Sequence, residues 1–300
     1  MRTPAGLTDL GTLMPELTTY RRTATRLHPR RGMVDADASH IGGPIRWPED
    51  ETWPMCAADL AGEDEQIVPQ LDGGYLAVRR PPAIGARPLP HPQPNPMIVL
   101  AQLRARDVPD LWCPLDHDVL QVLWCPCDHE QEHANTPTVR LRWRRHDPAV
   151  PVATPLAGIA DERFYVPIPC VFYPEQIDEY PDLEDLPDAL VTRIAALGEE
   201  IDYSGELSTA PGWKVGGWPQ WSVSGHRTHR CDTCGAAMSL LLTIDTVEHG
   251  GNRWEPVEER RLPLDESRSE PTGIVVGRWG SLQIFVCTRC PDHPTRPDLQ

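Results

Sequence analysis

The sequence predicts an α+β fold that is rich in strands: an internally duplicated, two-lobe arrangement of antiparallel sheets, with short helices and a zinc-ribbon-like pair of cysteine turns. Three observations predict it. Proline accounts for 34 of the 300 residues, which favours turns and short elements. Short apolar runs end at turn-forming residues, as strands do. Several sequence blocks occur twice in the same order, which is typical of a duplication.

Two helices are expected. The first lies in a leader over residues 1–34, where leucines recur at spacings of three and four residues, the pattern of one helix face. These are Leu7, Leu10, Leu13 and Leu17. The second is expected near residues 187–202, inside a connecting segment over residues 151–210, where Pro187 suits a first helical turn. The proline-rich residues 79–96 predict an extended loop.

Short apolar runs predict the strands. They are β-branched or otherwise apolar, and turn-forming residues bound them. Their short length favours strands over helices. The runs are MIVLAQL (97–103), VLQVLW (119–124), VRLRW (139–143), MSLLLTI (238–244), IVVGRW (274–279) and SLQIFV (281–286).

Three pairs of blocks indicate an internal repeat. HIGGPIRWP (40–48) resembles KVGGWPQWS (214–222), and MIVLAQL resembles MSLLLTI. LQVLWCPCDH (120–129) resembles LQIFVCTRCPDH (282–293), with the Leu-Gln pair, a cysteine and Asp-His in order. Collinear matches of this kind predict two related lobes. We expect the first lobe over residues 35–150 and the second over residues 211–300.

Two Cys-x-x-Cys turns in the second lobe predict a structural zinc site. The chain has nine cysteines, and in a reducing cytosol metal ligation explains them better than disulfides do. Cys231 and Cys234 form the first turn, and Cys287 and Cys290 form the second. Four thiolates would surround Zn²⁺ tetrahedrally and leave no position open for substrate. Redox or disulfide chemistry is the alternative use of such turns.

The first lobe offers a second set of metal-ligand residue types: Cys56, Cys125, Cys127 and His129. Cys56 aligns with Cys231, and Cys125 aligns with Cys287. No cysteine follows Cys56 at the spacing of a Cys-x-x-Cys turn. The alternative is a metal-free lobe in which cysteines serve as small buried apolar residues.

Charge and hydropathy limit the partners. A net charge of −16 would repel a phosphate backbone, so we expect no nucleic-acid partner, whereas a basic protein partner is compatible with it. No apolar run reaches the length of a membrane span or of a signal peptide's core. The sequence therefore predicts a cytoplasmic protein without a membrane partner. The acidic run IDEYPDLEDLPD (177–188) is interpreted as a solvated face.

One short motif suggests an enzyme instead. His129, Glu130 and His133 match the His-Glu-x-x-His pattern of zinc-dependent hydrolases. That pattern needs a helix to bring both histidines to one face, and Pro126 and Pro137 flank it here. Nucleophile elbows, phosphate-binding loops and dinucleotide fingerprints are missing from the sequence. A metal-dependent hydrolase is therefore the alternative function, and catalytic residues are not assigned.

HIGGPIRWPEDETWPMC followed by MIVLAQL resembles the YwqG-like bacterial family of unknown function. KVGGWPQW, CDTCGAAMSLLLTI and IFVCTRC resemble a wider grouping that contains this family, a yeast ribosome-biogenesis factor and the relatives of programmed cell death protein 2. The resemblance covers roughly residues 35–293. The residues that match the family motif are Lys214, Gly216, Gly217, Pro219, Trp221, Cys231, Cys234, Met238, Cys287 and Cys290.

This resemblance implies a β-rich, duplicated fold and protein binding without catalysis, because the eukaryotic members act as dedicated chaperones for a basic ribosomal protein. The function we expect is that of a zinc-stabilised protein-interaction or chaperone-like module with a protein partner. A toxin-neutralising, immunity-type binding protein is an alternative within the same class.

Overall fold

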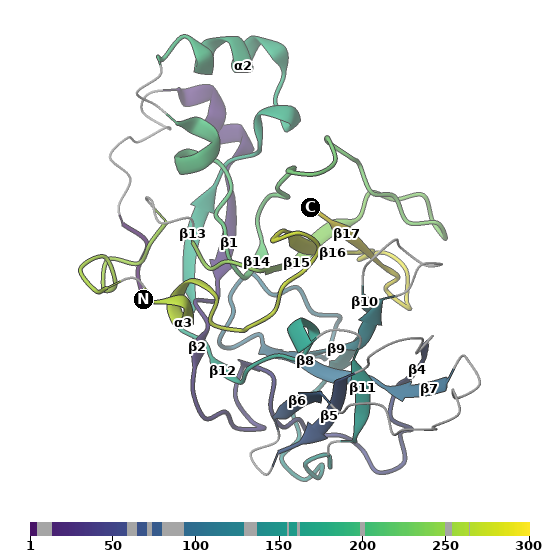
Figure 1. The fold of residues 1–300 in the computed structure, drawn as a ribbon. Helices are drawn as coiled ribbons and strands as arrows, with labels where there is room; N and C mark the ends of the chain where they lie inside the picture. The colour runs from purple at the N-terminus through teal and green to yellow at the C-terminus, as the bar shows by residue number, and fades with distance from the viewer. Residues whose placement is uncertain are drawn as a thin grey trace.

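The computed structural model describes residues 1–4, 14–58, 65–70, 74–79, 93–128, 137–154, 156–160, 163–198, 202–249, 254–263 and 265–300. The fold is rich in antiparallel strands and its helices are few and short (Figure 1), as the sequence predicts. Among the described residues, the helices lack the length and apolar character needed to span a bilayer.

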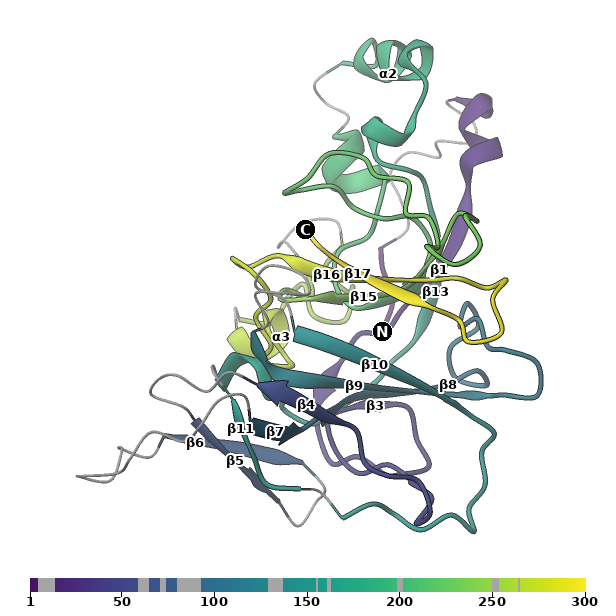
Figure 2. The ribbon, with the colours of Figure 1, turned by 90° about the vertical axis from the view of Figure 1, so that its right-hand side faces the viewer.

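Two six-stranded sheets dominate the fold. In spatial order, the lobe-1 sheet contains β10 (Pro137–Arg144), β9 (Val119–Asp128), β8 (Ile98–Arg104), β3 (His40–Ile41), β12 (Cys170–Val171) and β2 (Arg30–Arg31). The lobe-2 sheet contains β17 (Thr295–Leu299), β16 (Ser281–Val286), β15 (Ser239–Asp245), β14 (Lys214–Gly216), β1 (Arg22–Arg26) and β13 (Glu175–Glu179). Figure 2 shows strands β15–β17 of the lobe-2 sheet above strands β8–β10 of the lobe-1 sheet.

Two small sheets and several short helices complete the described structure. The small sheets are β11-β5-β6 (Gly158–Ala160, Glu65–Pro69, Tyr75–Arg79) and β4-β7 (Met55–Ala58, Gln93–Pro96). The helices are η1 (Pro15–Tyr20), η2 (Arg163–Tyr165), η3 (Leu183–Asp185), α2 (Asp188–Ala195), η4 (Tyr203–Leu207) and α3 (Glu266–Ser269). Of the expected proline-rich loop, residues 80–92 lie outside the described residues and Gln93–Pro96 form β7.

The two large sheets have matching strand orders. In the lobe-1 sheet β3, β8, β9 and β10 pair in succession, and in the lobe-2 sheet β14, β15, β16 and β17 do the same. Each sheet also carries an irregularity at the same place, since the register shifts between Val99 and Ala101 in β8 and between Leu240 and Leu242 in β15. An extra residue in one strand bends that strand locally. Both sheets therefore have a bend at the equivalent position.

A glutamine makes the same contact in both lobes. Gln121 of β9 donates from Nε2 to the carbonyl oxygen of Arg46 at 3.0 Å. Gln283 of β16 donates from Nε2 to the carbonyl oxygen of Gln220 at 2.6 Å. Arg46 and Gln220 occupy the same place in the two Gly-Gly blocks of the sequence. The likeness between the lobes thus extends from strand order to a single side-chain hydrogen bond.

Two segments outside the lobes each supply strands to both large sheets. β1 and β2 are neighbours in the sequence, yet β1 lies in the lobe-2 sheet and β2 lies in the lobe-1 sheet. β12 and β13 are divided in the opposite sense, with β12 in the lobe-1 sheet and β13 in the lobe-2 sheet. The leader (1–34) and the connecting segment (151–210) therefore supply strands to both sheets. The expected boundaries between leader, lobes and connecting segment do not separate the sheets.

The structure corrects the expected helical leader. Met14 to Tyr20 contains only the 3₁₀-helix η1, and Arg22–Arg26 and Arg30–Arg31 are strands, while residues 5–13 lie outside the described residues. Thr23 and Thr25 in β1 are β-branched and suit a strand. β1 also pairs on both edges, with β13 and β14, so tertiary hydrogen bonding favours a strand there. Leu7, Leu10 and Leu13 of the predicted helix face lie outside the described residues.

The second expected helix is present but shorter. α2 spans Asp188–Ala195 instead of reaching residue 202. Its Ile194 packs into a small apolar cluster with Leu17 of η1 and Leu207 of η4. This helical cap lies beside the lobe-2 sheet, at the top of Figure 1, on the side away from the lobe-1 sheet (Figure 2).

One apolar core joins the two lobes. It contains Leu103 and Val122 from the lobe-1 sheet, Leu242 and Ile284 from the lobe-2 sheet, and Leu27 from the turn between β1 and β2. All five side chains are fully buried. Because burial of apolar surface is the main stabilising contribution, we expect the two lobes to unfold together.

His40 of β3 makes the stability of the fold depend on pH. Burial lowers the pKa of His40 to about 4, whereas an exposed histidine has a pKa of about 6.5. The unfolded chain therefore binds the proton first, and stability is lost as the pH falls from 6.5 towards 4. For this group alone, lowering the pH from 7 to 5 is expected to remove about 2 kcal/mol from the free energy of unfolding.

Urea unfolding at both pH values, for the protein and for a His40→Gln variant, measures this effect. His40 Nε2 lies 3.0 Å from the carbonyl oxygen of Pro44, and a glutamine amide can donate the same hydrogen bond. Between pH 7 and pH 5, the free energy of unfolding should fall by about 2 kcal/mol less in the variant than in the parent. Equal losses would contradict the prediction.

Candidate metal centre

The lobe-2 sheet brings the two Cys-x-x-Cys turns together. Cys231 and Cys234 precede β15, Cys287 follows β16 directly, and Cys290 precedes β17. β15 and β16 are antiparallel neighbours, with Ser239 opposite Val286. The start of β15 therefore lies beside the end of β16, which closes a gap of 52 residues between Cys234 and Cys287.

The four sulfur atoms form a compact group. All of them lie within 4.8 Å of one another. Cys231 Sγ is 3.7 Å from Cys290 Sγ, and Cys234 Sγ is 3.6 Å from Cys287 Sγ. Three of the cysteines are buried and Cys234 is exposed.

These distances fit a tetrahedral metal site. Zn–S bonds of about 2.3 Å in a tetrahedron place the sulfurs about 3.8 Å apart, close to the separations of 3.7 and 3.6 Å in the Cys231–Cys290 and Cys234–Cys287 pairs. A disulfide would need about 2.05 Å, and all four cysteines are free thiols. Cys231, Cys234, Cys287 and Cys290 can thus hold a metal ion such as zinc.

Backbone hydrogen bonds shape each turn. Gly235 has a φ of +69°, a conformation that glycine adopts readily, and its amide donates to the carbonyl oxygen of Cys231 at 2.8 Å. In the second turn, the amide of His293 donates to the carbonyl oxygen of Cys290 at 3.1 Å. His293 Nδ1 also lies 3.2 Å from the carbonyl oxygen of Cys287. The ligand positions are therefore fixed by local structure.

The turns favour thiolate at one of the sulfurs. The backbone amide of Cys234 is the main cause that lowers the pKa of the Cys231 thiol to about 6. The Cys234 thiol raises the pKa of Cys290. Closely spaced thiols of this kind share their protons, and a metal ion relieves the repulsion between the thiolates by its own charge.

Residues around the sulfur group connect it to the rest of the molecule through packing and hydrogen bonds. Met238 packs against the three buried cysteines, and Arg296 of β17 donates to both carboxylate oxygens of Asp232 at 2.6 and 2.7 Å. The His293 ring lies edge-to-face against Trp112 of the first lobe, with ring centroids 4.9 Å apart. The second turn therefore contacts both lobes.

The other residues that match the motif of the resemblance lie in and after β14. Lys214 is buried and its Nζ lies 2.7 Å from Glu179 Oε1. Gly216 and Gly217 have φ angles of +73° and +74°, and a Cβ at Gly217 would collide with Glu179 Oε2. A larger residue is thus excluded at this turn.

The other two motif residues support the same region. Trp221 donates from Nε1 to Asp185 Oδ2 at 2.7 Å, and Pro219 is buried. Asp185 and Glu179 belong to the acidic run 177–188. Their side chains are only 6% and 0% exposed, so the expected solvated face is incorrect at these two positions.

The predicted first-lobe metal site is only partly within the described residues, because His129 lies outside them. Cys125 and Cys127 of β9 are buried beside Asn95, whose Nδ2 lies 4.0 and 3.5 Å from their sulfur atoms. Asn95 is also the register partner of Cys56. Among the described residues, the distances expected of a metal site are met by the second-lobe cysteines alone.

Asn95 and the buried charged residues Arg26 and Glu248 belong to no motif of the sequence. Asn95 is 2% exposed and binds both backbone groups of Ile159, at 2.8 and 3.0 Å. The side chains of Arg26 and Glu248 are each 1% exposed. Arginine and glutamate are usually exposed, and no motif marks these positions, so the sequence carried no signal for them.

Comparison with known proteins found no match to this chain, either among the models of protein families or among the curated proteins.

Proposed function

We propose that this protein is a zinc-stabilised protein-interaction module with a chaperone-like role. The observation that carries the proposal is the closed group of four cysteine sulfurs, all within 4.8 Å of one another. Four protein ligands complete a tetrahedral zinc site, and catalytic zinc sites keep one position for water or substrate. The residues that would hold the metal therefore assign it a stabilising role.

The YwqG-like resemblance and the internal duplication belong to the same proposal. The matching strand orders, the equivalent bends and the equivalent glutamine contacts support descent of the two lobes from one duplicated unit. The family motif residues also stabilise one region of the second lobe, through the contacts of Lys214 and Trp221. A duplicated, β-rich protein that binds other proteins is what this resemblance implies.

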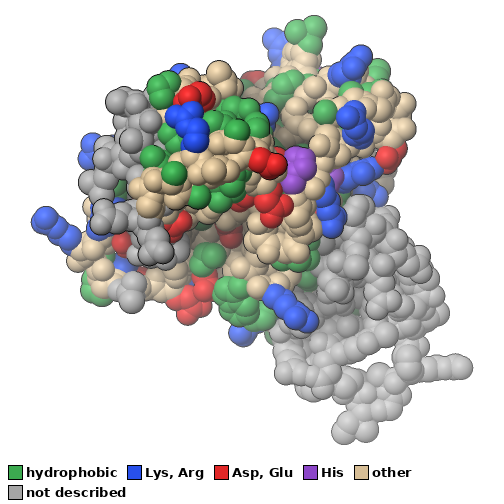
Figure 3. Space-filling view, turned by 90° about the horizontal axis from the view of Figure 1, so that it is seen from above, with side chains coloured by type: hydrophobic (Ala, Val, Ile, Leu, Met, Phe, Trp, Pro, Cys, Tyr) green, Lys and Arg blue, Asp and Glu red, His purple; other side chains and the backbone are tan. Residues whose placement is uncertain are grey.

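The partner that suits this chain is a basic protein. The net charge of −16 favours encounter with a positively charged partner and disfavours nucleic acid. On the face shown in Figure 3, acidic and basic side chains are interspersed.

Affinity isolation from the native cell, followed by mass spectrometry, tests the proposal. The bait is the full chain at its native level, washed at low and at high salt. A reproducible basic partner that is lost at high salt supports the proposal, since screening weakens such contacts. The purified pair should then bind in a calorimeter. Failure to recover any reproducible partner would contradict it.

Two alternatives are outcomes of the same work. The hydrolase hypothesis rests on His129, Glu130 and His133, which lie outside the described residues. Peptidase activity that disappears in a Glu130→Gln variant would favour it, because that glutamate activates the water in such enzymes. Rescue of cells from a co-expressed toxin would instead favour an immunity-type binding protein.

A further inference from the structure

The segment Met1–Pro4 lies against residues from distant parts of the chain. The Arg2 amide donates to Glu258 Oε2 at 3.0 Å, and Arg2 Nε donates to Glu258 Oε1 at 3.1 Å. The amide of Val257 donates to the carbonyl oxygen of Arg2 at 3.0 Å. Arg2 is therefore bound through its amide, its carbonyl and its guanidinium group at once.

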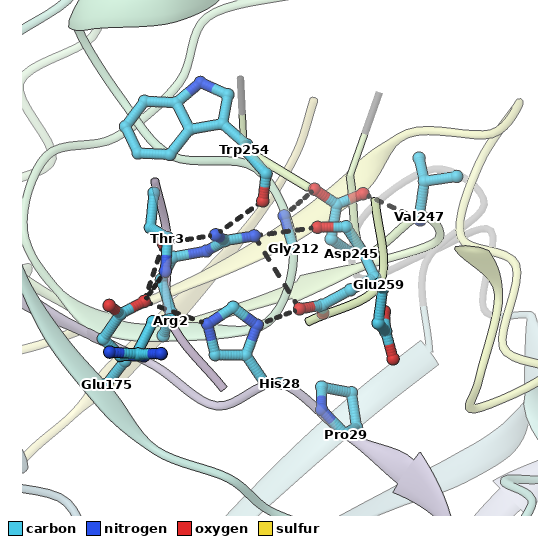
Figure 4. A network of polar contacts seen from close by, with 12 residues as sticks. Arg2, Thr3, His28, Pro29, Glu175, Gly212, Asp245, Val247, Trp254 and Glu259 are labelled. Carbon is cyan, nitrogen blue, oxygen red and sulfur yellow. Dashed lines mark hydrogen bonds and ion pairs between the residues drawn. The ribbon is translucent and has the colours of Figure 1, made fainter. Parts of the chain in front are cut away.

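Thr3 makes an equally complete set of contacts. Its amide and its hydroxyl donate to Glu175 Oε2 at 2.6 and 2.7 Å. Its hydroxyl oxygen accepts a hydrogen bond from Arg26 Nη1 at 2.8 Å. Figure 4 shows Thr3 between Glu175 and Trp254, above the ring of His28.

The groups beneath Thr3 are held in place by the fold. Arg26 Nη1 also donates to the carbonyl oxygen of Trp254 at 2.9 Å, and Arg26 Nη2 donates to that of Glu248 at 3.1 Å. His28 Nδ1 lies 2.6 Å from Glu248 Oε1, and His28 Nε2 lies 3.3 Å from Glu175 Oε2. Arg26, His28 and Glu248 are at most 1% exposed. The surface that receives Thr3 is thus a preorganised set of charged and polar groups.

We propose that these residues form a peptide-binding groove, and that the segment Met1–Pro4 occupies it in place of a partner. The groove consists of Glu175, Arg26, Val257 and Glu258, and the carbonyl oxygen of Trp254 holds Arg26 in place behind them. Its contacts define the ligand as an extended segment in which arginine is followed by threonine or serine. Glu258 selects the guanidinium, Glu175 and Arg26 select the hydroxyl, and Val257 fixes the backbone.

This inference goes beyond the proposed function, because it names a site and a ligand chemistry that do not involve the cysteines. A segment joined covalently to its own groove competes at an effective concentration of roughly millimolar. An external peptide therefore has to displace Met1–Pro4. Release of this segment should open the groove to binding partners.

The test uses an acetylated, fluorescently labelled peptide with the sequence MRTPAG, which is that of residues 1–6. Binding is measured by fluorescence anisotropy to the full chain and to a variant that lacks residues 2–4. The truncated variant should bind the peptide at least tenfold more tightly than the parent. A MATPAG peptide should bind it at least fivefold more weakly than MRTPAG, because Glu258 then has no guanidinium partner.

A full-length Arg2→Ala variant repeats the test without truncation and should also gain affinity for MRTPAG. Introducing Glu258→Gln into the truncated variant should remove most of the gain. Arg21→Ala is the matched control, since Arg21 forms an exposed ion pair with Asp178 at 3.4 Å on another part of the surface. It should leave peptide affinity unchanged.

Zinc content and melting temperature of each variant show that the fold is intact and separate this test from that of the metal site. Equal affinity of the parent, the truncated variant and Arg2→Ala for MRTPAG would overturn the inference. Equal binding of MRTPAG and MATPAG would overturn it as well.

Discussion

Replacing Cys234 by serine is expected to lower the zinc content and the melting temperature of the protein together. Cys234 is the exposed member of the four cysteines, so serine costs little packing there and the loss reports on the metal. Metal binding by such sites is linked to folding. We expect a loss of several kcal/mol in the free energy of unfolding, or a decrease of about 10 °C in melting temperature.

Elemental analysis and differential scanning calorimetry of the purified protein measure both quantities. Cys113→Ser is the matched control, because Cys113 is a partly exposed cysteine outside the sulfur group. It should retain one zinc ion per chain. Addition of a strong chelator to the parent should reproduce the Cys234→Ser effect. Absence of zinc from the parent, or an unchanged melting temperature in Cys234→Ser, would contradict the metal site.

Replacing Lys214 by methionine is expected to lower the free energy of unfolding by a similar amount, for a different reason. Lys214 is the sole lysine of the chain. It donates to Glu179 Oε1 at 2.7 Å and to the carbonyl oxygen of Trp218 at 3.0 Å. Both charged side chains are at most 1% exposed. Removing one partner of a buried ion pair leaves the other charge uncompensated, which costs about 3–5 kcal/mol.

Chemical denaturation of single and double variants checks this second prediction. Glu179 also accepts hydrogen bonds from the amides of Ala210 and Trp218 at 2.8 and 2.9 Å. A Lys214→Met, Glu179→Gln double variant removes the uncompensated charge and keeps an acceptor oxygen for one of these two amides, so it should regain part of the lost stability. Arg21→Ala removes an exposed ion pair and should cost less than about 1 kcal/mol. A Lys214→Met variant as stable as Arg21→Ala would show that the buried pair is not needed.

Local sequence patterns predicted five of the twelve strands that the structure describes in the two large sheets: β8, β9, β10, β15 and β16. The runs over residues 97–103 and 281–286 correspond closely to β8 and β16, because a short apolar run between turns suits a buried strand. The run IVVGRW is an exception. Gly277 and Trp279 have φ angles of +57° and +62°, and only Val276 pairs, with Gly280. A tight turn replaces the strand there, which apolar composition alone does not reveal.

The sequence by itself determined which residues can hold a metal and where the repeated blocks lie. The two-residue spacing of each cysteine turn and the order of the blocks are local properties, so they can be read without the fold. Antiparallel pairing of β15 with β16 then brings Cys234 Sγ to 3.6 Å from Cys287 Sγ.

Only the tertiary structure decided how β1, β2, β12 and β13 divide between the two sheets, the inward position of Glu179 and the docking of Met1–Pro4. Each depends on partners far away in the sequence: β1 pairs with β13 and β14, Glu179 with Lys214, and Thr3 with Glu175. A strand edge or a charged side chain carries no local mark of its partner, because the stabilising hydrogen bonds form only when distant segments meet in the fold.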